Sequence, residues 1–239
     1  MPALFPNERE GKIMTTNDRQ LIFKDRTDAG KRLATALSGY KHGENIVFAI
    51  PRGGVPVAAE VAAALKTTLD IIVVRKIPIP HNTEAGYGAV TEDGSLVLNE
   101  PMVKYLGLTM PEITRQSEAV RNEIIRRNRL CREILPPSRV EGRTAIVIDD
   151  GLASGYTMLA AIQSLRNRKA SEVVVAVPVA SGTAYDLVGS AADKLICLKV
   201  ARTDYFAVAS YYLNWYDLDD EEVLQYLKLL NPHHADVKE

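Results

Sequence analysis

The sequence is poor in the residues that build disulfide frameworks and zinc sites. It has two cysteines, Cys131 and Cys197, with neither a CxxC nor a CxxxH spacing, and its four histidines lack partners at metal-ligand spacing. Neither a disulfide framework nor a histidine or cysteine metal site is predicted. Low cysteine content is typical of the cytoplasm, where thiols stay reduced, and we expect that location.

Long apolar runs and an excess of one charge are also missing. No apolar stretch approaches the roughly 20 residues that cross a bilayer, and the N-terminal region holds no apolar signal core. The formal net charge is -1, whereas general nucleic-acid binders usually carry a clear basic excess. The sequence therefore predicts neither a membrane protein nor a general nucleic-acid-binding protein.

The composition is that of an ordinary globular protein. Hydrophobic residues make up 46% of the chain and charged residues 25%, and 239 residues fit one α/β domain with additions. Residues 1–17 are polar and without periodicity, which predicts a flexible arm, and residues 233–239 form a polar tail. We assign residues 18–232 to a single domain.

Apolar strands alternate with amphipathic helices along this domain. Strands are predicted over residues 45–50, 69–77, 144–148, 172–179 and 194–200, and helices over residues 25–40, 55–65, 111–135, 157–166, 183–188 and a terminal segment that ends near 230. The alternation predicts an α/β fold with an open, mainly parallel sheet and helices on both faces. Such sheets bind ligands where the carboxyl ends of strands turn into helices.

Residues 78–99 differ from the rest of the domain. They combine prolines and glycines with a Glu-Asp-Gly turn, which predicts a hairpin or a mobile flap. An ordinary exposed hairpin would have the same composition.

The clearest functional pattern follows the strand at residues 144–148. Asp149 and Asp150 come directly after it, and small residues then lead from Gly151 to Thr157 into a helix. Small residues let backbone amides converge on an anion, and a helix N-terminus adds partial positive charge. Two carboxylates can accept hydrogen bonds from vicinal hydroxyls or bind hydrated magnesium. The pattern predicts a site for a ribose 5-phosphate.

Other phosphate-binding patterns do not fit this segment. A Walker loop needs Gly-Lys followed by Ser or Thr, and a dinucleotide fingerprint needs G-x-G-x-x-G, and the segment has neither. The competing structural interpretation is a polar turn after a strand, with Ser154 capping the helix.

Residues 146–157 resemble the signature of type I phosphoribosyltransferases, which has apolar residues, two acids and a small-residue loop with Gly and Thr. The resemblance covers about residues 23–230. It is closest to an uncharacterised bacterial and archaeal subgroup that carries PRGGVPVA, here residues 51–58, and VVRK, here residues 73–76. It implies the type I phosphoribosyltransferase fold with a flexible hairpin lid and a small hood.

The resemblance also implies roles for individual residues. The 5-phosphate of phosphoribosyl pyrophosphate would bind at Ala153, Ser154, Gly155, Tyr156 and Thr157. Pyrophosphate would bind at Arg52, Gly53, Gly54, Arg75 and Lys76. Asp149, Asp150 and Lys76 would be catalytic, with both acids also holding magnesium, directly or through water.

Each supporting motif has a plainer alternative. Family members often hold a non-proline cis peptide in the pyrophosphate loop, which we expect between Pro51 and Gly53, but the segment also fits a plain strand-to-helix turn. Arg75 and Lys76 also fit charged side chains that extend into solvent from a strand end.

The implied reaction transfers ribose 5-phosphate from phosphoribosyl pyrophosphate to a small nitrogen acceptor, a nucleobase or a related compound, with magnesium as cofactor and pyrophosphate as product. Ala153 stands where 6-oxopurine enzymes carry an aspartate, so no general base is assigned. The alternative function is a regulatory protein that binds phosphoribosyl pyrophosphate or a nucleotide without turnover. The assembly is left open, with a homodimer as one candidate.

Two further groups of residues are given structural interpretations. The arginines between Arg115 and Arg132 alternate with glutamates, which predicts a solvated helix face rather than an RNA or DNA surface. The late aromatics are expected in the core, with one of them available to stack on a base beneath the hood; they are Tyr205, Phe206, Tyr211, Tyr212, Trp215 and Tyr216.

Overall fold

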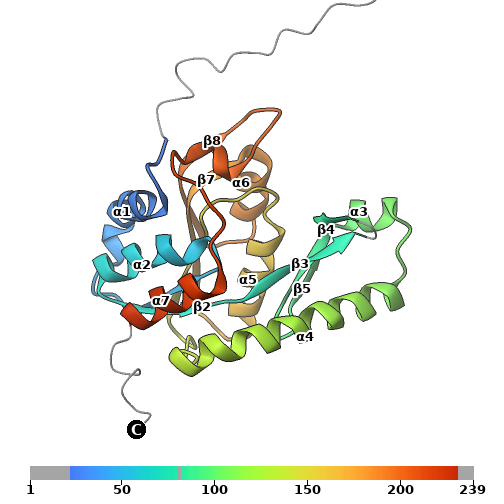
Figure 1. The fold of residues 1–239 in the computed structure, drawn as a ribbon, viewed down its shortest axis with the longest axis horizontal. Coiled ribbons are helices and arrows are strands. Elements are labelled where there is room, and N and C mark those ends of the chain that lie inside the picture. Colours follow the sequence, from blue (N-terminus) through green and yellow to red (C-terminus); the bar gives the residue numbers. More distant parts are fainter. Residues whose placement is uncertain (1–21, 80–81, 231–239) are drawn as a thin grey trace, which may run out of the picture.

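The computed structural model describes residues 22–79 and 82–230. The predicted N-terminal arm, the tail with its two histidines, and His81 lie outside the described residues. Figure 1 shows a parallel core sheet, a separate smaller sheet beside it, and the long helix α4 running along both. None of the helices in the described ranges is both long and apolar enough to span a bilayer.

The core sheet is built from five parallel strands in the order β2-β1-β6-β7-β8. Their bounds are β1 (Asn45–Ala49), β2 (Thr68–Ile71), β6 (Thr144–Ile148), β7 (Glu172–Ser181) and β8 (Lys194–Ala201). The predicted open, mainly parallel sheet is confirmed. The strand order reverses between β1 and β6, whose last residues Ala49 and Ile148 are register partners. Open α/β sheets form their ligand crevice at such a reversal.

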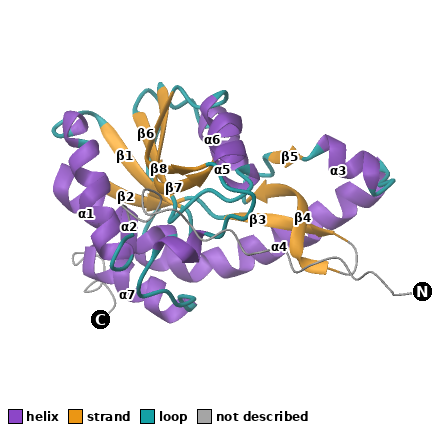
Figure 2. Ribbon diagram, turned by 90° about the horizontal axis from the view of Figure 1, so that it is seen from above, coloured by secondary structure: helices purple, strands orange, loops and turns teal. Residues whose placement is uncertain are grey.

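Helices cover both faces of the core sheet, as predicted. Their bounds are α1 (Arg26–Ala36), α2 (Gly54–Leu65), α5 (Tyr156–Asn167), α6 (Gly182–Gly189) and α7 (Asp220–Leu230), with short 3-10 turns η2 (Ser38–Tyr40) and η3 (Val208–Tyr211). Figure 2 shows α1, α2 and α7 on one side of these strands and α5 and α6 on the other. Val47 and Ile146 pack toward the first group, whereas their neighbours Phe48 and Val147 pack toward the second. Successive side chains of a strand point to opposite faces, so each strand contributes to two cores.

The smaller sheet holds the predicted hairpin. It is antiparallel and consists of β3 (Val74–Ile79), β4 (Asn82–Thr91) and β5 (Leu96–Leu98), followed by α3 (Glu100–Tyr105) and α4 (Met110–Ile134). Its own core includes Ile77, Tyr87 and Ile124. Gly94, in the turn between β4 and β5, has a φ of 88°, a conformation that favours glycine.

The predicted single strand at residues 69–77 is wrong. The chain leaves the core sheet after Ile71 and enters the smaller sheet at Val74. The amide of Ile72 makes a last hydrogen bond to the carbonyl of Ala49, 2.9 Å away. Residues 71–74 are all apolar and β-branched, so the sequence pattern does not mark the point where the chain changes sheets.

Two expectations about side-chain placement are corrected by the structure. Arg132 does not lie on the solvated face of α4, because its side chain is 18% exposed and pairs with the buried Asp70. Tyr205 and Tyr216 are not core residues, since they are 94% and 55% exposed, whereas Tyr211 and Tyr212 are buried.

Candidate active site

A cavity of about 580 Å³ brings together segments that are far apart in the sequence. Pro51 and Arg52 line it from the loop between β1 and α2, Arg75 and Lys76 from β3, and Thr157 from the first turn of α5. Its volume falls within the range of small-molecule sites, roughly 300 to 1,000 Å³. Four of the predicted site residues, Arg52, Arg75, Lys76 and Thr157, therefore share one cavity.

The other walls of this cavity come from α4 and α7, which the sequence did not connect with the site. α4 contributes Val120, Glu123, Asn128 and Cys131. α7 contributes Asp220, Val223 and Leu224, and Asp220 Oδ1 lies 3.7 Å from Nη1 of Arg52. The available sequence signal was Asn128, a polar residue at i+4 from Ile124 and i+8 from Val120 on the apolar stripe of α4.

The loop before α5 leaves backbone donors unused. Gly155 precedes the helix with a φ of 83°, and no side chain caps the helix start. In the described part of the chain, the amides of residues 153–157 make no hydrogen bond. The interpretation in which Ser154 caps this helix is therefore wrong. Free amides at a helix N-terminus are suited to an anion.

Contacts with β7 and α6 hold this loop in place. The hydroxyl of Ser181 donates to the carbonyl of Ala153 at 2.8 Å, and the Leu152 amide donates to the carbonyl of Val179 at 2.9 Å. Ala153 and Ser154 are exposed, whereas Gly155 is buried beneath α6. A side chain at position 155 would be strained by the positive φ and crowded by Val188.

Asp149 and Asp150 lie against the loop between β1 and α2 rather than in the cavity wall. A Cβ atom on Gly53 would collide with the Asp150 carboxylate, and one on Gly54 would lie 2.7 Å from the carbonyl oxygen of Ile148. The two glycines therefore allow this loop to approach the acids. The Pro51–Arg52 peptide is cis, as expected between Pro51 and Gly53.

Arg26, which the sequence did not single out, is the ion-pair partner of Asp150. Its Nε donates to Oδ2 of Asp150 at 2.9 Å, and its Nη1 donates to the carbonyl of Tyr216 at 2.8 Å. The guanidinium carbon lies 3.9 Å from the ring centre of Trp215. The hydroxyl of Tyr212 donates to the carbonyl of Asp150 at 2.6 Å. These contacts tie the acid pair to the aromatic segment after β8.

Burial and mutual repulsion set the protonation of the acids. Burial, together with the neighbouring Asp150, raises the pKa of Asp149 well above its ordinary value. Burial also raises the pKa of Asp150, although the Arg26 guanidinium opposes the rise. Adjacent carboxylates in a desolvated place do not both ionise easily, so the pair favours a cation or hydrogen-bond donors beside it.

Asp149 and Asp150 fit magnesium only if waters and substrate oxygens supply its other ligands. Among the described residues, no three His, Cys, Asp or Glu side chains converge as a metal-binding group. Oδ1 of Asp149 accepts from the Asp150 amide at 2.8 Å, and Arg26 occupies Oδ2 of Asp150. Magnesium usually keeps several waters and is held by one or two carboxylates together with substrate oxygens. The residues present suit that kind of site.

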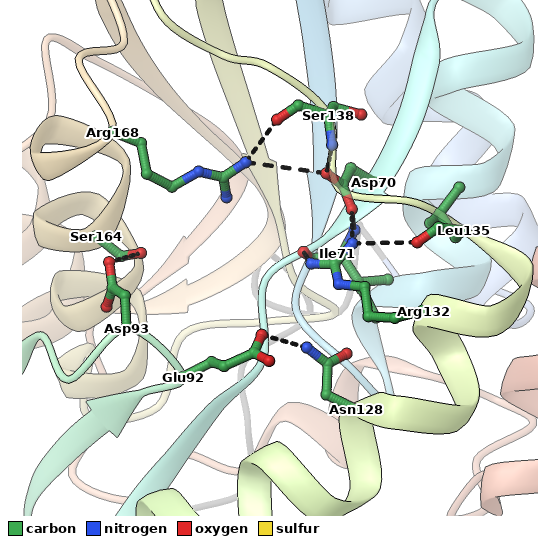
Figure 3. A network of polar contacts seen from close by, with 10 residues as sticks. All are labelled: Asp70, Ile71, Glu92, Asp93, Asn128, Arg132, Leu135, Ser138, Ser164 and Arg168. Atoms are coloured by element: carbon green, nitrogen blue, oxygen red, sulfur yellow. Dashed lines mark hydrogen bonds and ion pairs between the residues drawn. The ribbon is translucent and has the colours of Figure 1, made fainter.

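A second cavity, of about 410 Å³, lies at a network of charged side chains. Asp70, which is fully buried, accepts from Nη1 of Arg132 at 2.5 Å and from the Ser138 amide at 2.8 Å (Figure 3). Arg168 lies 4.0 Å from Asp70 and donates to the carbonyl of Ser138 at 2.8 Å. These groups satisfy one another, which is the pattern of a structural network.

The same network ties the hairpin to the helices. Glu92, just after β4, accepts a hydrogen bond from Nδ2 of Asn128 on α4 (Figure 3). Asp93 accepts one from the hydroxyl of Ser164 on α5 at 2.8 Å. The base of the predicted lid is therefore anchored to both helices.

Known proteins resemble this chain in sequence and in fold. The family model for the phosphoribosyl transferase domain matches residues 22–214. Two Mycobacterium tuberculosis proteins, provisionally named phosphoribosyl transferases, are 37% identical over 209 residues, which are 86% of this chain and 46% of theirs. The chain thus spans about half the length of the curated relatives it matches.

A solved structure matches over a larger share of both chains. The crystal structure of the Thermus thermophilus protein TT1426 superposes with a TM-score of 0.74 and 37% sequence identity, over 87% of this chain and 98% of that one. With the family match over most of the chain, the conclusion is that this protein belongs to the phosphoribosyl transferase domain family.

Proposed function

We propose that the chain transfers the 5-phosphoribosyl group of phosphoribosyl pyrophosphate to a nitrogen acceptor and releases pyrophosphate. One observation carries the proposal: Thr157, the loop residue Arg52 and the β3 residues Arg75 and Lys76 line the same cavity. A substrate with a phosphate at one end and a pyrophosphate at the other needs such separate groups around one space.

The substrate would be held by three groups of residues. The amides of Ala153, Ser154, Gly155 and Tyr156, with the amide and hydroxyl of Thr157, would bind the 5-phosphate. Asp149 and Asp150 would accept hydrogen bonds from the ribose hydroxyls. Pyrophosphate would bind to the side chains of Arg52, Arg75 and Lys76 and to the amides of Gly53 and Gly54.

The proposed chemistry needs charge stabilisation more than a nucleophile from the protein. The bond between the ribose C1 atom and the pyrophosphate oxygen breaks, the bond from C1 to nitrogen forms, and the nitrogen loses its proton. Negative charge grows on the leaving group, where Arg52, Arg75 and Lys76 would stabilise it. Asp149 and Asp150 would hold magnesium together with substrate oxygens, and the ion would supply positive charge to offset the charge of pyrophosphate.

Two features bear on the proton transfer from the acceptor and on the exclusion of water. Ala153 offers no proton-accepting side chain, so the general base stays unassigned. The hairpin at residues 78–99 would exclude water, because water competes with the acceptor for the activated sugar.

The test is magnesium-dependent consumption of phosphoribosyl pyrophosphate in a screen of nucleobases and small amines, read as pyrophosphate release. Asp150→Asn should reduce kcat/KM by about 10²-fold or more. The exposed Asp204→Asn is the matched control and should behave as the native chain. Magnesium-dependent binding without release for any acceptor would favour the regulatory alternative. Absence of binding, or normal turnover by Asp150→Asn, would overturn the proposed site.

A further inference from the structure

The side-chain amide of Asn128, on α4, is buried, and only one of its two polar atoms has a hydrogen-bond partner among the described residues. Asn128 is 1% exposed and is among the residues that line the larger cavity. Its Nδ2 donates to a carboxylate oxygen of Glu92. Within residues 22–79 and 82–230, its Oδ1 has no hydrogen-bond partner. Buried polar atoms are nearly always paired, so a lone acceptor beside a cavity calls for an explanation.

Glu92 determines which end of this amide remains available. A carboxylate only accepts hydrogen bonds, so it holds the NH₂ end of Asn128 and turns the oxygen away from itself. Glu92 directly follows β4, and the next residue, Asp93, accepts a hydrogen bond from Ser164. The orientation of the Asn128 amide is therefore fixed by the hairpin and not by α4 alone.

The residues around Asn128 indicate which kind of group would donate a hydrogen bond to its Oδ1. The lining of the cavity on this side combines the apolar side chains of Val120, Val223 and Leu224 with two carboxylates, Glu123 and Asp220. A buried amide oxygen beside these apolar side chains suits the N–H edge of a flat heterocycle or an aromatic amine, since the ring covers the apolar side chains. A ribose hydroxyl is less well matched, because the acid pair already offers acceptors for it.

We propose that Oδ1 of Asn128 accepts a hydrogen bond from an N–H group of the nitrogen acceptor, and that Glu92 is a positioning residue that presents this oxygen. This inference rests on the proposed function and extends it to a specificity-determining residue. It also gives the hairpin a second role, because the segment proposed to exclude water also orients the group that recognises the acceptor.

The experiment measures two affinities separately. Binding of adenine, hypoxanthine, uracil, orotate and aniline is followed by saturation-transfer nuclear magnetic resonance, and binding of magnesium phosphoribosyl pyrophosphate by calorimetry. Leucine is similar in shape to asparagine but has no hydrogen-bond acceptor. Asn128→Leu should therefore lower the affinity for each probe that the native chain binds by roughly tenfold. Its affinity for phosphoribosyl pyrophosphate should stay native. Asn122→Leu, on the exposed face of α4, is the matched control and should bind every probe as the native chain does.

A paired exchange separates recognition from packing. Glu92→Gln should also weaken probe binding, because glutamine can donate or accept and no longer fixes the amide. In the double variant Glu92→Gln with Asn128→Asp, the side-chain NH₂ at position 92 donates to one carboxylate oxygen at position 128. The other carboxylate oxygen at position 128 is again left free. It should restore the affinity for probes to nearly the native value, which loss of packing alone would not allow.

Three outcomes would overturn the proposal. The first is that the native chain and Asn128→Leu bind all five probes with equal affinity, or that neither binds any of them. Loss of affinity for phosphoribosyl pyrophosphate instead of the probes is the second, and failure of the paired exchange to rescue is the third. If the native chain does not bind magnesium phosphoribosyl pyrophosphate, the proposed function fails by that separate measurement.

Discussion

The two cavities use similar residue types in opposite ways. In the smaller cavity the charges of Asp70, Arg132 and Arg168 lie within reach of one another, and the network around them has its partners inside the protein. Beside the larger cavity, in the described part of the chain, the amides of residues 153–157 and Oδ1 of Asn128 have no protein partner. Val73 lines both spaces, and the Glu92–Asn128 pair links the residues that line them.

The difference gives a criterion for distinguishing the proposed binding site from a structural polar cluster. Charge and burial occur in both places and do not distinguish them. What distinguishes them is whether donors and acceptors are already satisfied, because a satisfied group gains little from a ligand and an unsatisfied buried group gains a full hydrogen bond. Substitutions in the smaller cavity should therefore reduce stability, and substitutions at the larger one should reduce binding.

The largest effect is expected from Arg132→Met in the smaller cavity. The substitution removes the ion-pair partner of the buried Asp70 carboxylate, whose other nearby guanidinium, that of Arg168, lies 4.0 Å away. We expect the free energy of unfolding to fall by about 3–5 kcal/mol. Urea denaturation measures this. Arg139→Met is the control, because Arg139 is 84% exposed and its pair with Glu141 should contribute no more than about 1 kcal/mol. Similar losses in both variants would contradict the structural role of the network.

A smaller loss of stability is expected from Gly53→Ala. The added Cβ collides with the Asp150 carboxylate, so the loop or the acid must shift, at roughly 1–3 kcal/mol. Gly39→Ala is the matched control, since a Cβ there meets no heavy atom within 4 Å. Thermal unfolding compares the two. If Gly53→Ala matched its control and kept its affinity for phosphoribosyl pyrophosphate, the close approach of loop and acids would be unimportant.

Thr157→Val tests the larger cavity without disturbing the fold. Loss of one hydroxyl to a charged phosphate should weaken binding of phosphoribosyl pyrophosphate by about tenfold, with little change in stability. Thr114→Val, at an exposed position on α4, controls for the loss of a hydroxyl. Calorimetry gives both affinities. Unchanged binding would place the phosphate elsewhere.

The smallest effect is expected at Asp93, and it depends on pH. Burial raises the pKa of Asp93, but hydrogen bonds from Thr91, Ser95 and Ser164 outweigh burial, so its pKa in the folded protein is lowered. A lowered pKa gives stability that is present above the unfolded pKa, about 3.9, and lost as the pH falls through the folded value.

Asp93→Asn should therefore be less stable than the native chain at pH 7, by no more than about 1 kcal/mol because the site is exposed. The gap should close as the pH falls below about 4. Denaturation curves at both pH values test this, with the exposed Asp204→Asn as control. A gap that widened in acid would contradict the sign of the pKa change.

Features encoded in short segments were predictable. The strand before Asp149, the helix after Gly155 and the cis peptide at Pro51 follow from local residue patterns and from the family resemblance. The boundary between β2 and β3 was not predictable, because residues 71–74 form one apolar run across it and only the pairing with different neighbouring strands separates the two.

The amino-acid sequence alone determined the family, the alternation of strands and helices, and the loops that carry the acids and the unused amides, because each depends on residues close together in the chain. Only the tertiary structure decided that Arg26 pairs with Asp150, 124 positions away, and that Arg132 neutralises Asp70. It also brought Asn128 into contact with Glu92 and into the lining of the larger cavity. Parallel strands need long crossover connections, so the neighbours of a site residue come from distant segments that no local pattern can identify.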